Sequence, residues 1–393
     1  MRTLPQLILL LVLVSCKKPA IPFTRGMARE IPWQDSSLRH PKHAAFQNLL
    51  IKYQQKGLPG ISLLIRDQYG TWVGAAGKAD IAHQVDFQPG TISKAASITK
   101  LMMGTLFMKI MEDSLHTGIG FRGLDKKVSD WLPASLISHI PNGRLITLRQ
   151  CLKHETGIPD IIEQDPFYLA VLNNPNKKWQ PEELLRFIYD KPALFLPGDT
   201  AIYSNSNFIL VSMILEAQTQ QPHELLLKKY ILEPLGMKDT YYPWHDALPS
   251  NVAQGYFDLY NNHSVVNVSN LITGSGNGYG GIYSNLFDLY KFGDALLWRK
   301  DLLQASTYNL MTNTGKTDGN NRYGLGIQQS FLDHGNDYGW GHKGRDLGYT
   351  ANLFYFPSSG VLQVFFINYG TDSKSELREV FYEFQDELMA ISL

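Results

Sequence analysis

The chain has 393 residues, and its 36 Lys and Arg balance its 36 Asp and Glu, so the formal net charge is zero. An apolar fraction of 44% and an aromatic fraction of 12% are typical of soluble globular proteins and exclude a disordered chain. With no excess of positive charge, a nucleic-acid partner is not expected. The length exceeds the roughly 250–300 residues at which one core stops growing, which predicts two subdomains or a large insertion.

The first residues form a short apolar segment, Leu7 to Val14, followed by Ser15 and Cys16. This segment is too short to span a membrane. It resembles a bacterial lipoprotein signal, in which the chain is cleaved before the cysteine and the new N-terminal Cys16 is lipidated. The alternative is an ordinary secretory peptide with an incidental cysteine.

The lipoprotein resemblance implies a signal peptide at 1–15 and a Pro-containing tether at 16–42. It also implies a membrane partner through the lipidated N-terminus. The protein would then be exported and anchored in the bacterial cell envelope, at the outer membrane or the periplasmic face. Two or three acyl chains would hold it firmly, because each buried CH₂ group contributes about 0.8 kcal/mol.

Residues 43–393 have the patterns of a folded domain, with strands near both ends and helices between them. In chain order, we expect a helix at His43–Tyr53, strands at Ile61–Arg66 and Thr71–Ala76, helices at Ser97–Glu112, Asn207–Gln218 and His223–Leu235, strands at Tyr349–Phe356 and Val361–Asn368, and a helix at Lys374–Ile391. This order predicts an α+β fold with an antiparallel sheet flanked by helices. The sheet would come from about 43–96 and 320–393, and an all-helical subdomain would be inserted at about 97–250.

Several common chemistries have no matching pattern. The sequence contains no Gly-x-Ser-x-Gly elbow, and His154-Glu155 lacks the second histidine of a zinc site because position 158 is Ile. Gly315 and the two residues after it look like the end of a phosphate loop, but its first glycine is missing. Cys151 is expected to be a small buried group. We therefore expect neither a metal nor a cofactor.

A Ser-x-x-Lys pattern opens the helix predicted at Ser97–Glu112. Three residues make nearly one helical turn, so the Lys100 amine can reach the Ser97 hydroxyl. The helix is apolar all round and should be buried, which would lower the pKa of Lys100 and make it a candidate base. Alternatively, Ser97 is only an N-cap and Lys100 only extends to solvent.

Two further patterns carry polar groups. Tyr203-Ser204-Asn205 precedes a helical run, so a phenol and an amide could face a cleft, although Tyr260 and Tyr283 begin similar triplets. In Gly-His-Lys-Gly-Arg at 341–345, strand alternation places His342 and Gly344 on one face. His342 could then donate to a substrate oxygen or carboxylate, and Gly344 would let a substrate backbone approach. Alternatively, this is a Gly-rich turn with a solvated histidine.

Together, these three patterns in this order resemble the serine β-lactamase and penicillin-binding DD-peptidase superfamily, in the branch of class C β-lactamases and related esterases and peptidases. The resemblance runs from about residue 43 to 390 and includes connecting phrases at 146–159, 233–237 and 280–285. The last phrase contains Tyr283, which selects Tyr203 as the family tyrosine.

The resemblance implies that Ser97 is the nucleophile and that Lys100 and Tyr203 share the proton transfer; which of the two is the base stays open. Asn205 would orient the substrate, with His342 and Gly344 lining its strand. The backbone N–H groups of Ser97 and Arg345 would form the oxyanion hole.

One residue departs from the family pattern, because many members have a lysine where this chain has His342. Histidine near neutral pH is mostly uncharged, Lys343 lies on the opposite face, and Arg345 could supply the charge instead. We expect a serine hydrolase that forms an acyl-enzyme with a peptide, ester or β-lactam carbonyl, with efficient β-lactam hydrolysis less favoured. The alternative is a catalytically silent protein that binds or senses cell-wall fragments on the same fold.

Overall fold

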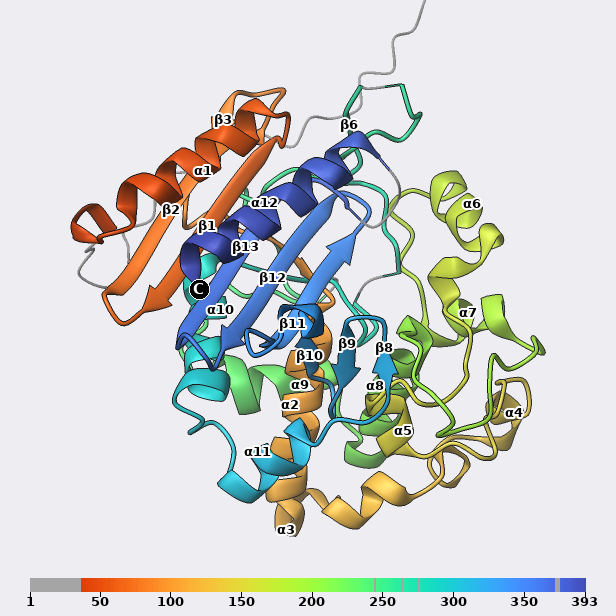
Figure 1. Ribbon diagram of the computed structural model, residues 1–393. Coiled ribbons are helices and arrows are strands. Elements are labelled where there is room, and N and C mark those ends of the chain that lie inside the picture. The colour runs from red at the N-terminus through yellow and green to blue at the C-terminus, as the bar shows by residue number, and fades with distance from the viewer. Residues whose placement is uncertain (1–36, 244, 263, 275, 372–374) are drawn as a thin grey trace, which may run out of the picture.

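The computed structural model describes residues 37–393 except 244, 263, 275 and 372–374 (Figure 1). Within these residues, nine strands form one antiparallel sheet. In spatial order they are β3 (Val85–Asp86), β2 (Gly70–Asp80), β1 (Gly60–Asp67), β13 (Val361–Ile367), β12 (Tyr349–Phe356), β11 (Gly339–Asp346), β10 (Gln328–Ser330), β9 (Asn321–Tyr323) and β8 (Thr317–Asp318). Two smaller pairs join β4 (Ser93–Ala96) to β7 (Ile282–Ser284) and β5 (Tyr256–Phe257) to β6 (Val266–Asn267).

Strands from the two ends of the domain pair with each other at the centre of the sheet. β1 pairs with β13, with Leu63 opposite Phe365. All seven residues of β13 are buried, which explains its nearly continuous apolar sequence rather than an alternating one. The expected α+β fold with an antiparallel sheet is confirmed.

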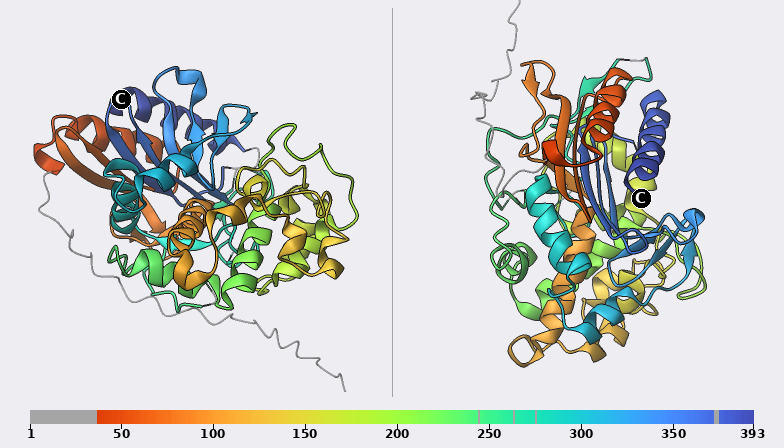
Figure 2. Two further views of the ribbon diagram at one scale, coloured as in Figure 1. Left: turned by 90° about the horizontal axis from the view of Figure 1, so that it is seen from below. Right: turned by 60° about the vertical axis from the view of Figure 1, so that its left-hand side comes forward.

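Helices cover both faces of the sheet. The helix α1 (His43–Gln55) and the C-terminal helix α12 (Glu376–Ser392) pack side by side on one face, and α2 (Ile98–Glu112) and α10 (Leu286–Gly293) lie on the other (Figure 2). Each face has its own apolar core. The remaining helices are α3 (Ser114–Thr117), α4 (Ala134–Ile137), α5 (Leu148–Leu152), α6 (Asp165–Asn173), α7 (Pro181–Leu185), α8 (Asn205–Thr219), α9 (His223–Leu227) and α11 (Ala305–Thr312). Short 3₁₀ turns occur at Ser37–Arg39, Phe121–Asp125, Val128–Asp130, Ile161–Glu163, Arg186–Ile188 and Leu332–His334, and π-helical turns at Lys228–Leu232 and Asp294–Trp298.

The helix α2 is the central helix of the molecule, and nearly all of its side chains are buried. The helix packs closely against the backbone at Leu325 because Gly104 has no side chain. A Cβ at Gly104 would lie 2.4 Å from the carbonyl oxygen of Leu325. The helix is thereby held between the sheet and the helical part of the chain, and its N-terminus is fixed in place.

The N-terminal boundary of the fold differs from the expected one. The sequence predicts that residues 37–42 belong to the tether, but the Ser37 hydroxyl accepts a hydrogen bond from the Val73 N–H, and His40 contacts the Asp67 carboxylate at 3.1 Å. His40 is buried against β1, so these residues belong to the folded domain. The signal peptide, Cys16 and the rest of the expected tether lie outside the described residues.

Cys151 lies on α5 as a buried free thiol, and burial raises its pKa. Among the described residues, no helix is both long enough and apolar enough to cross a membrane.

Candidate active site

Ser97 sits at the junction between β4 and α2. β4 pairs with β7 through a register shift between Lys94 and Ala96, and Ala96 has a left-handed φ of 50°. A non-glycine residue in this conformation stores strain, which commonly marks a functional turn. The chain then enters α2 with Ser97 as the residue before its first turn.

Two side chains converge on the Ser97 hydroxyl. The Lys100 amine donates to Ser97 Oγ at 3.0 Å, and the Tyr203 hydroxyl donates to the same oxygen at 2.8 Å. Lys100 is on the same helix one turn away, whereas Tyr203 comes from the loop before α8. The arrangement places two groups that can accept a proton next to one candidate nucleophile.

The Lys100 amine is fully buried and is held by two more acceptors, Asn205 Oδ1 at 2.6 Å and the Tyr279 carbonyl oxygen at 2.5 Å. Asn205 donates in turn to Asp160 Oδ2 at 2.9 Å. Burial raises the pKa of Asp160 to about 6, although the hydrogen bonds it accepts favour its charged form. Both ends of the Asn205 amide are therefore engaged by the protein, and it orients Lys100.

The Tyr203 ring is fixed by its neighbours. Its backbone N–H donates to Asp318 Oδ2 at 3.1 Å, and its ring lies 4.5 Å from the His154 ring, centroid to centroid. His154 is buried with a left-handed φ of 58°, and burial holds its pKa well below the usual value. The Ser204 N–H donates to His154 Nδ1, so this ring acts as a neutral acceptor that shapes the loop.

His342 lies on β11 beside Tyr203, with 6.2 Å between ring centroids. Burial, reinforced by the Lys100 charge, lowers the pKa of His342 to about 3. Its Nδ1 lies 2.7 Å from the Lys343 carbonyl oxygen. Because a carbonyl only accepts, Nδ1 carries the proton and Nε2 of the neutral ring is an acceptor. In this tautomer the free Nε2 would accept a hydrogen bond from a substrate, and the expected donation from His342 to a substrate oxygen or carboxylate stays a prediction.

Neither neighbouring cation supplies the charge that this neutral ring lacks. The Lys343 amine points to the opposite face, where it contacts Asn321 Oδ1 at 3.1 Å. The Arg345 guanidinium donates to the Ala351 carbonyl oxygen at 2.8 Å and lies over the Phe381 ring of α12. The suggestion that the Arg345 side chain could serve a substrate carboxylate is not supported by this geometry.

The strand β11 continues beyond its pairing with β10. β10 pairs with 339–341, and the Lys343 N–H points to that same side, where it donates to Gln328 Oε1. Strand alternation directs the Arg345 N–H to this side as well, past the end of β10. The geometry agrees with the expected oxyanion pair of Ser97 and Arg345, whose role stays a prediction.

Gly344 packs against the backbone of β4. A Cβ at this position would lie 2.2 Å from the Ala95 carbonyl oxygen, so glycine is required by the close approach of β4 to β11. This contact lies on the face of β11, and the expected approach of a substrate backbone to the strand edge at Gly344 stays a prediction.

A narrow cavity of about 30 Å³ opens at Ser97. Its wall includes Asp346, which pairs with buried Lys94 at 3.0 Å and accepts from Thr273 Oγ1 at 2.8 Å. Burial alone would raise the pKa of Asp346, but the Lys94 charge holds it below its usual value. The other residues lining the cavity are Ala96, Ile162, Tyr168, Asn205, Tyr279, Gly280 and Arg345.

The family assignment follows from the whole chain. The sequence model of the family described as Beta-lactamase matches residues 44–383, which include every residue of the site above. The chain belongs to the β-lactamase family. It is accordingly a member of the β-lactamase and penicillin-binding protein superfamily, as the resemblance of its motifs implies.

The chain is similar to proteins named as hydrolases and as a penicillin-binding protein. Unguisins hydrolase ungD of Aspergillus violaceofuscus is 26% identical over 51% of this chain and 35% of its own length. A Bacillus subtilis protein named as penicillin-binding protein PbpX is 27% identical over 71% of this chain and 65% of its own length. The chain thus spans about a third to two thirds of these curated relatives. A solved D-stereospecific amidohydrolase from Streptomyces sp. superposes with a TM-score of 0.72 and 30% identity, covering 84% of this chain and 94% of that one.

The sequence reading missed four supporting groups of this β-lactamase-family site: Asp160, His154, Asp318 and the Tyr279 carbonyl. Asp160 directly follows the phrase at 146–159, which contains His154, and Tyr279 directly precedes the phrase at 280–285. Their positions in or next to these family phrases were the signals that could have identified Asp160, His154 and Tyr279 as site residues. Asp318 lies on the short strand β8, and nothing in the sequence connects it to Tyr203.

Proposed function

We propose that the protein hydrolyses an amide, ester or lactam carbonyl through an acyl-enzyme on Ser97. The observation that carries this proposal is the contact of Ser97 Oγ with both the Lys100 amine and the Tyr203 hydroxyl. In the first step, Ser97 Oγ attacks the carbonyl carbon while its proton passes to one of these two groups. Collapse of the tetrahedral intermediate then transfers a proton to the leaving amine or alcohol, and water later cleaves the acyl-enzyme by the same route.

Among the possible substrates, we favour peptide-type amides and esters over β-lactams. Because His342 is neutral and the Lys343 and Arg345 side chains are directed elsewhere, none of these three residues of β11 offers the cation that a substrate carboxylate would pair with. The solved structure named as a D-stereospecific amidohydrolase, 30% identical to this chain, supports an amide carbonyl next to a D-configured residue.

The test is intact-protein mass spectrometry over time after mixing the protein with a D-amino acid amide, a p-nitrophenyl ester and a chromogenic β-lactam. We expect turnover of the amide or ester with a transient adduct, little β-lactam turnover, and no adduct in Ser97→Ala. Adduct formation that survives Ser97→Ala would disprove the proposal. A folded wild type that reacts with none of the three but binds cell-wall fragments would support the silent binding protein instead.

We also propose that Cys16 is lipidated and that the protein is held at the bacterial cell envelope. Support comes from the sequence around Leu13-Val14-Ser15-Cys16 alone. In cells expressing the full chain, Cys16→Ser should move the protein from the membrane fraction to the soluble fraction or leave it unprocessed. Equal membrane association of both forms would contradict this anchor.

A further inference from the structure

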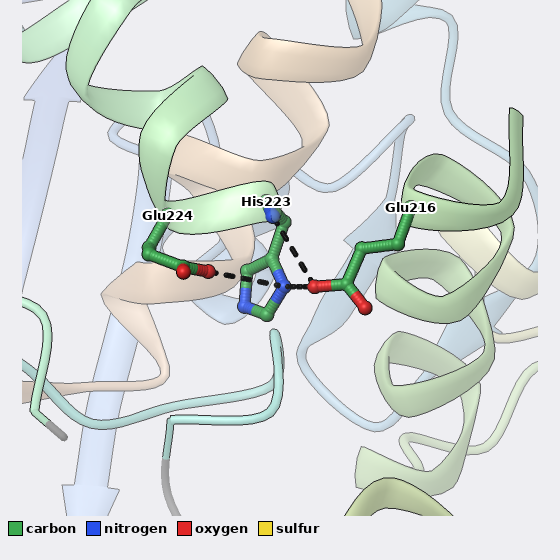
Figure 3. Close-up of side chains that lie close together, drawn as sticks. All are labelled: Glu216, His223 and Glu224. Atoms are coloured by element: carbon green, nitrogen blue, oxygen red, sulfur yellow. Dashed lines mark hydrogen bonds and ion pairs between the residues drawn. The ribbon is translucent and has the colours of Figure 1, made fainter. Parts of the chain in front are cut away.

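A second cluster of ionisable side chains lies apart from Ser97, where α8 ends and α9 begins. We call Glu216, His223, Glu224 and His245 the His223 cluster. Figure 3 shows the His223 ring between the carboxylates of Glu216, near the end of α8, and Glu224, next to it on α9. His223 Nδ1 lies 2.5 Å from Glu216 Oε1 and 3.9 Å from Glu224 Oε2.

One oxygen of this cluster is buried without a hydrogen-bond donor. Glu224 is only 8% exposed, and within the described residues its Oε2 has no hydrogen-bond partner. Its other oxygen lies 2.8 Å from His245 Nδ1. The Nδ1 proton of His223 already points to Glu216, so it cannot also satisfy Glu224 at 3.9 Å. A buried carboxylate oxygen left in this state is costly unless a cation approaches it.

We propose that the His223 cluster binds one divalent transition-metal ion of the Zn²⁺ class. Three donors, one imidazole nitrogen from His223 and one carboxylate oxygen each from Glu216 and Glu224, lie within 4.8 Å of one another, and His245 or water would complete a tetrahedral set that suits this ion. In a tetrahedral zinc site with bonds of about 2.0–2.2 Å, neighbouring donors stand roughly 3.3 Å apart. The separations of 2.5 and 3.9 Å from His223 Nδ1 lie on either side of that value, so small side-chain movements would admit the ion.

The surroundings meet two further requirements of a metal site. His223 Nε2 lies 2.7 Å from the Tyr242 hydroxyl, which also accepts from the Gly278 N–H at 3.0 Å. When Nδ1 binds an ion, the ring proton resides on Nε2, and a partner there orients the ligand. Access is provided by a cavity of about 420 Å³ lined by Glu224, Tyr242 and His245.

The ion would connect three segments of the chain. Glu216 lies near the end of α8, and His223 and Glu224 are the first two residues of α9. His245 lies on the segment that follows Tyr242. The Tyr242 hydroxyl in turn accepts a hydrogen bond from the Gly278 N–H. Tyr279, which follows Gly278, supplies the carbonyl oxygen that accepts from Lys100. The ion would therefore stabilise the fold next to the site without touching the reacting atoms, and its binding does not depend on the chemistry proposed for Ser97.

The test is a Zn²⁺ titration of the purified full chain, without a polyhistidine tag, in competition with a chromogenic chelator. We expect one ion per chain and a Tm that rises with the free Zn²⁺ concentration. Glu224→Gln and His245→Ala should each weaken binding at least about tenfold and remove the Tm shift. His116→Ala is the matched control, because His116 is an exposed histidine paired with Asp113, and it should bind like the wild type.

Glu216→Gln covers the case in which a buried variant fails to fold, since the Glu216 side chain is 39% exposed. It should keep the metal-free Tm and still lose affinity at least about tenfold. A wild type that takes up no stoichiometric Zn²⁺ at micromolar free ion would overturn the proposal. Uptake that is equal in Glu216→Gln, His245→Ala and the wild type would also overturn it, because the ion would then sit elsewhere.

Discussion

Lys100 and Asn205 illustrate how the site is organised at the scale of single residues. A lysine buried without acceptors would be too costly to retain its charge, yet three groups accept from this amine: Ser97 Oγ, Asn205 Oδ1 and the Tyr279 carbonyl oxygen. Asp160 supports Asn205 from behind. The position of the amine is therefore determined by contacts that lie outside the Ser-x-x-Lys pattern itself.

The buried neutral state of His342 makes a prediction about stability and pH. Its pKa is about 3 in the folded chain and about 6.5 when unfolded, so between these pH values the unfolded chain binds one more proton and stability rises with pH. Lowering the pH from 7 to 5 should therefore cost about 2 kcal/mol through this residue. His342→Gln should remove that part of the acid sensitivity, measured by urea unfolding at both pH values.

The control for this experiment is His116→Gln, because His116 is exposed on the surface of α3. It should leave the difference in unfolding free energy between pH 7 and 5 almost unchanged. An unaltered acid sensitivity in His342→Gln would show that the ring is not held neutral in the folded protein.

At the scale of elements, the junction of β4, β11 and α2 positions the nucleophile. β4 delivers Ser97 to the start of α2, and β11 passes so close to it that only glycine fits at 344. The register shift in β4 and the left-handed Ala96 make the turn at which the hydroxyl is presented. Any change in the separation of β4 and β11 should therefore change the position of Ser97.

Gly344→Ala tests this close packing. The added methyl group would lie 2.2 Å from the Ala95 carbonyl oxygen, so β4 must move away. We expect the free energy of unfolding to fall by about 1–3 kcal/mol, as for other overpacked sites, and the rate of Ser97 acylation to fall with it. Chemical denaturation and the adduct time course measure the two effects.

Gly120→Ala is the matched control, since the nearest heavy atom to its Cβ would be Ser114 Cβ at 3.9 Å and its φ of −98° suits any residue. It should change neither quantity appreciably. If Gly344→Ala also kept wild-type stability and acylation, β4 and β11 would not be tightly coupled.

At the scale of the whole molecule, the two faces of the sheet have separate tasks. The face under α2 carries the site, whereas α1 and α12 bury the other face in an apolar core of their own. Phe384 of α12 is fully buried in that second core, with its ring 5.4 Å from those of Tyr53 and Phe365. The second core therefore stabilises the sheet from the side away from Ser97.

Phe384→Ala should separate stability from activity. Removing this ring leaves a cavity and should lower the free energy of unfolding by about 3–5 kcal/mol. At a temperature where the variant stays folded, its rate of Ser97 acylation should equal that of the wild type. Tyr382→Ala on the same helix is the control, because Tyr382 is 40% exposed, and its effect should stay within about 0.5 kcal/mol. A slow but folded Phe384→Ala would mean that the two faces are coupled.

The sequence by itself determined the local features of this protein. Apolar periodicity located the four longest helices and the central strands, because a helix and a strand repeat with fixed periods of their own. It also placed Lys100 beside Ser97, since three residues always make nearly one helical turn. Tyr203 lies 106 residues away, and only the resemblance of the surrounding phrases separated it from Tyr260 and Tyr283.

Only the tertiary structure decided the contacts between distant segments. The pairing of Asp160 with Asn205, the support of Tyr203 by Asp318, the neutral ring of His342 and the β4 backbone against Gly344 all depend on how the sheet and helices pack. The same holds for residues 37–42, whose polar sequence suggested a tether until the sheet provided partners for Ser37 and His40. Burial and charge at these positions come from neighbours far along the chain, and no local pattern of residues records them.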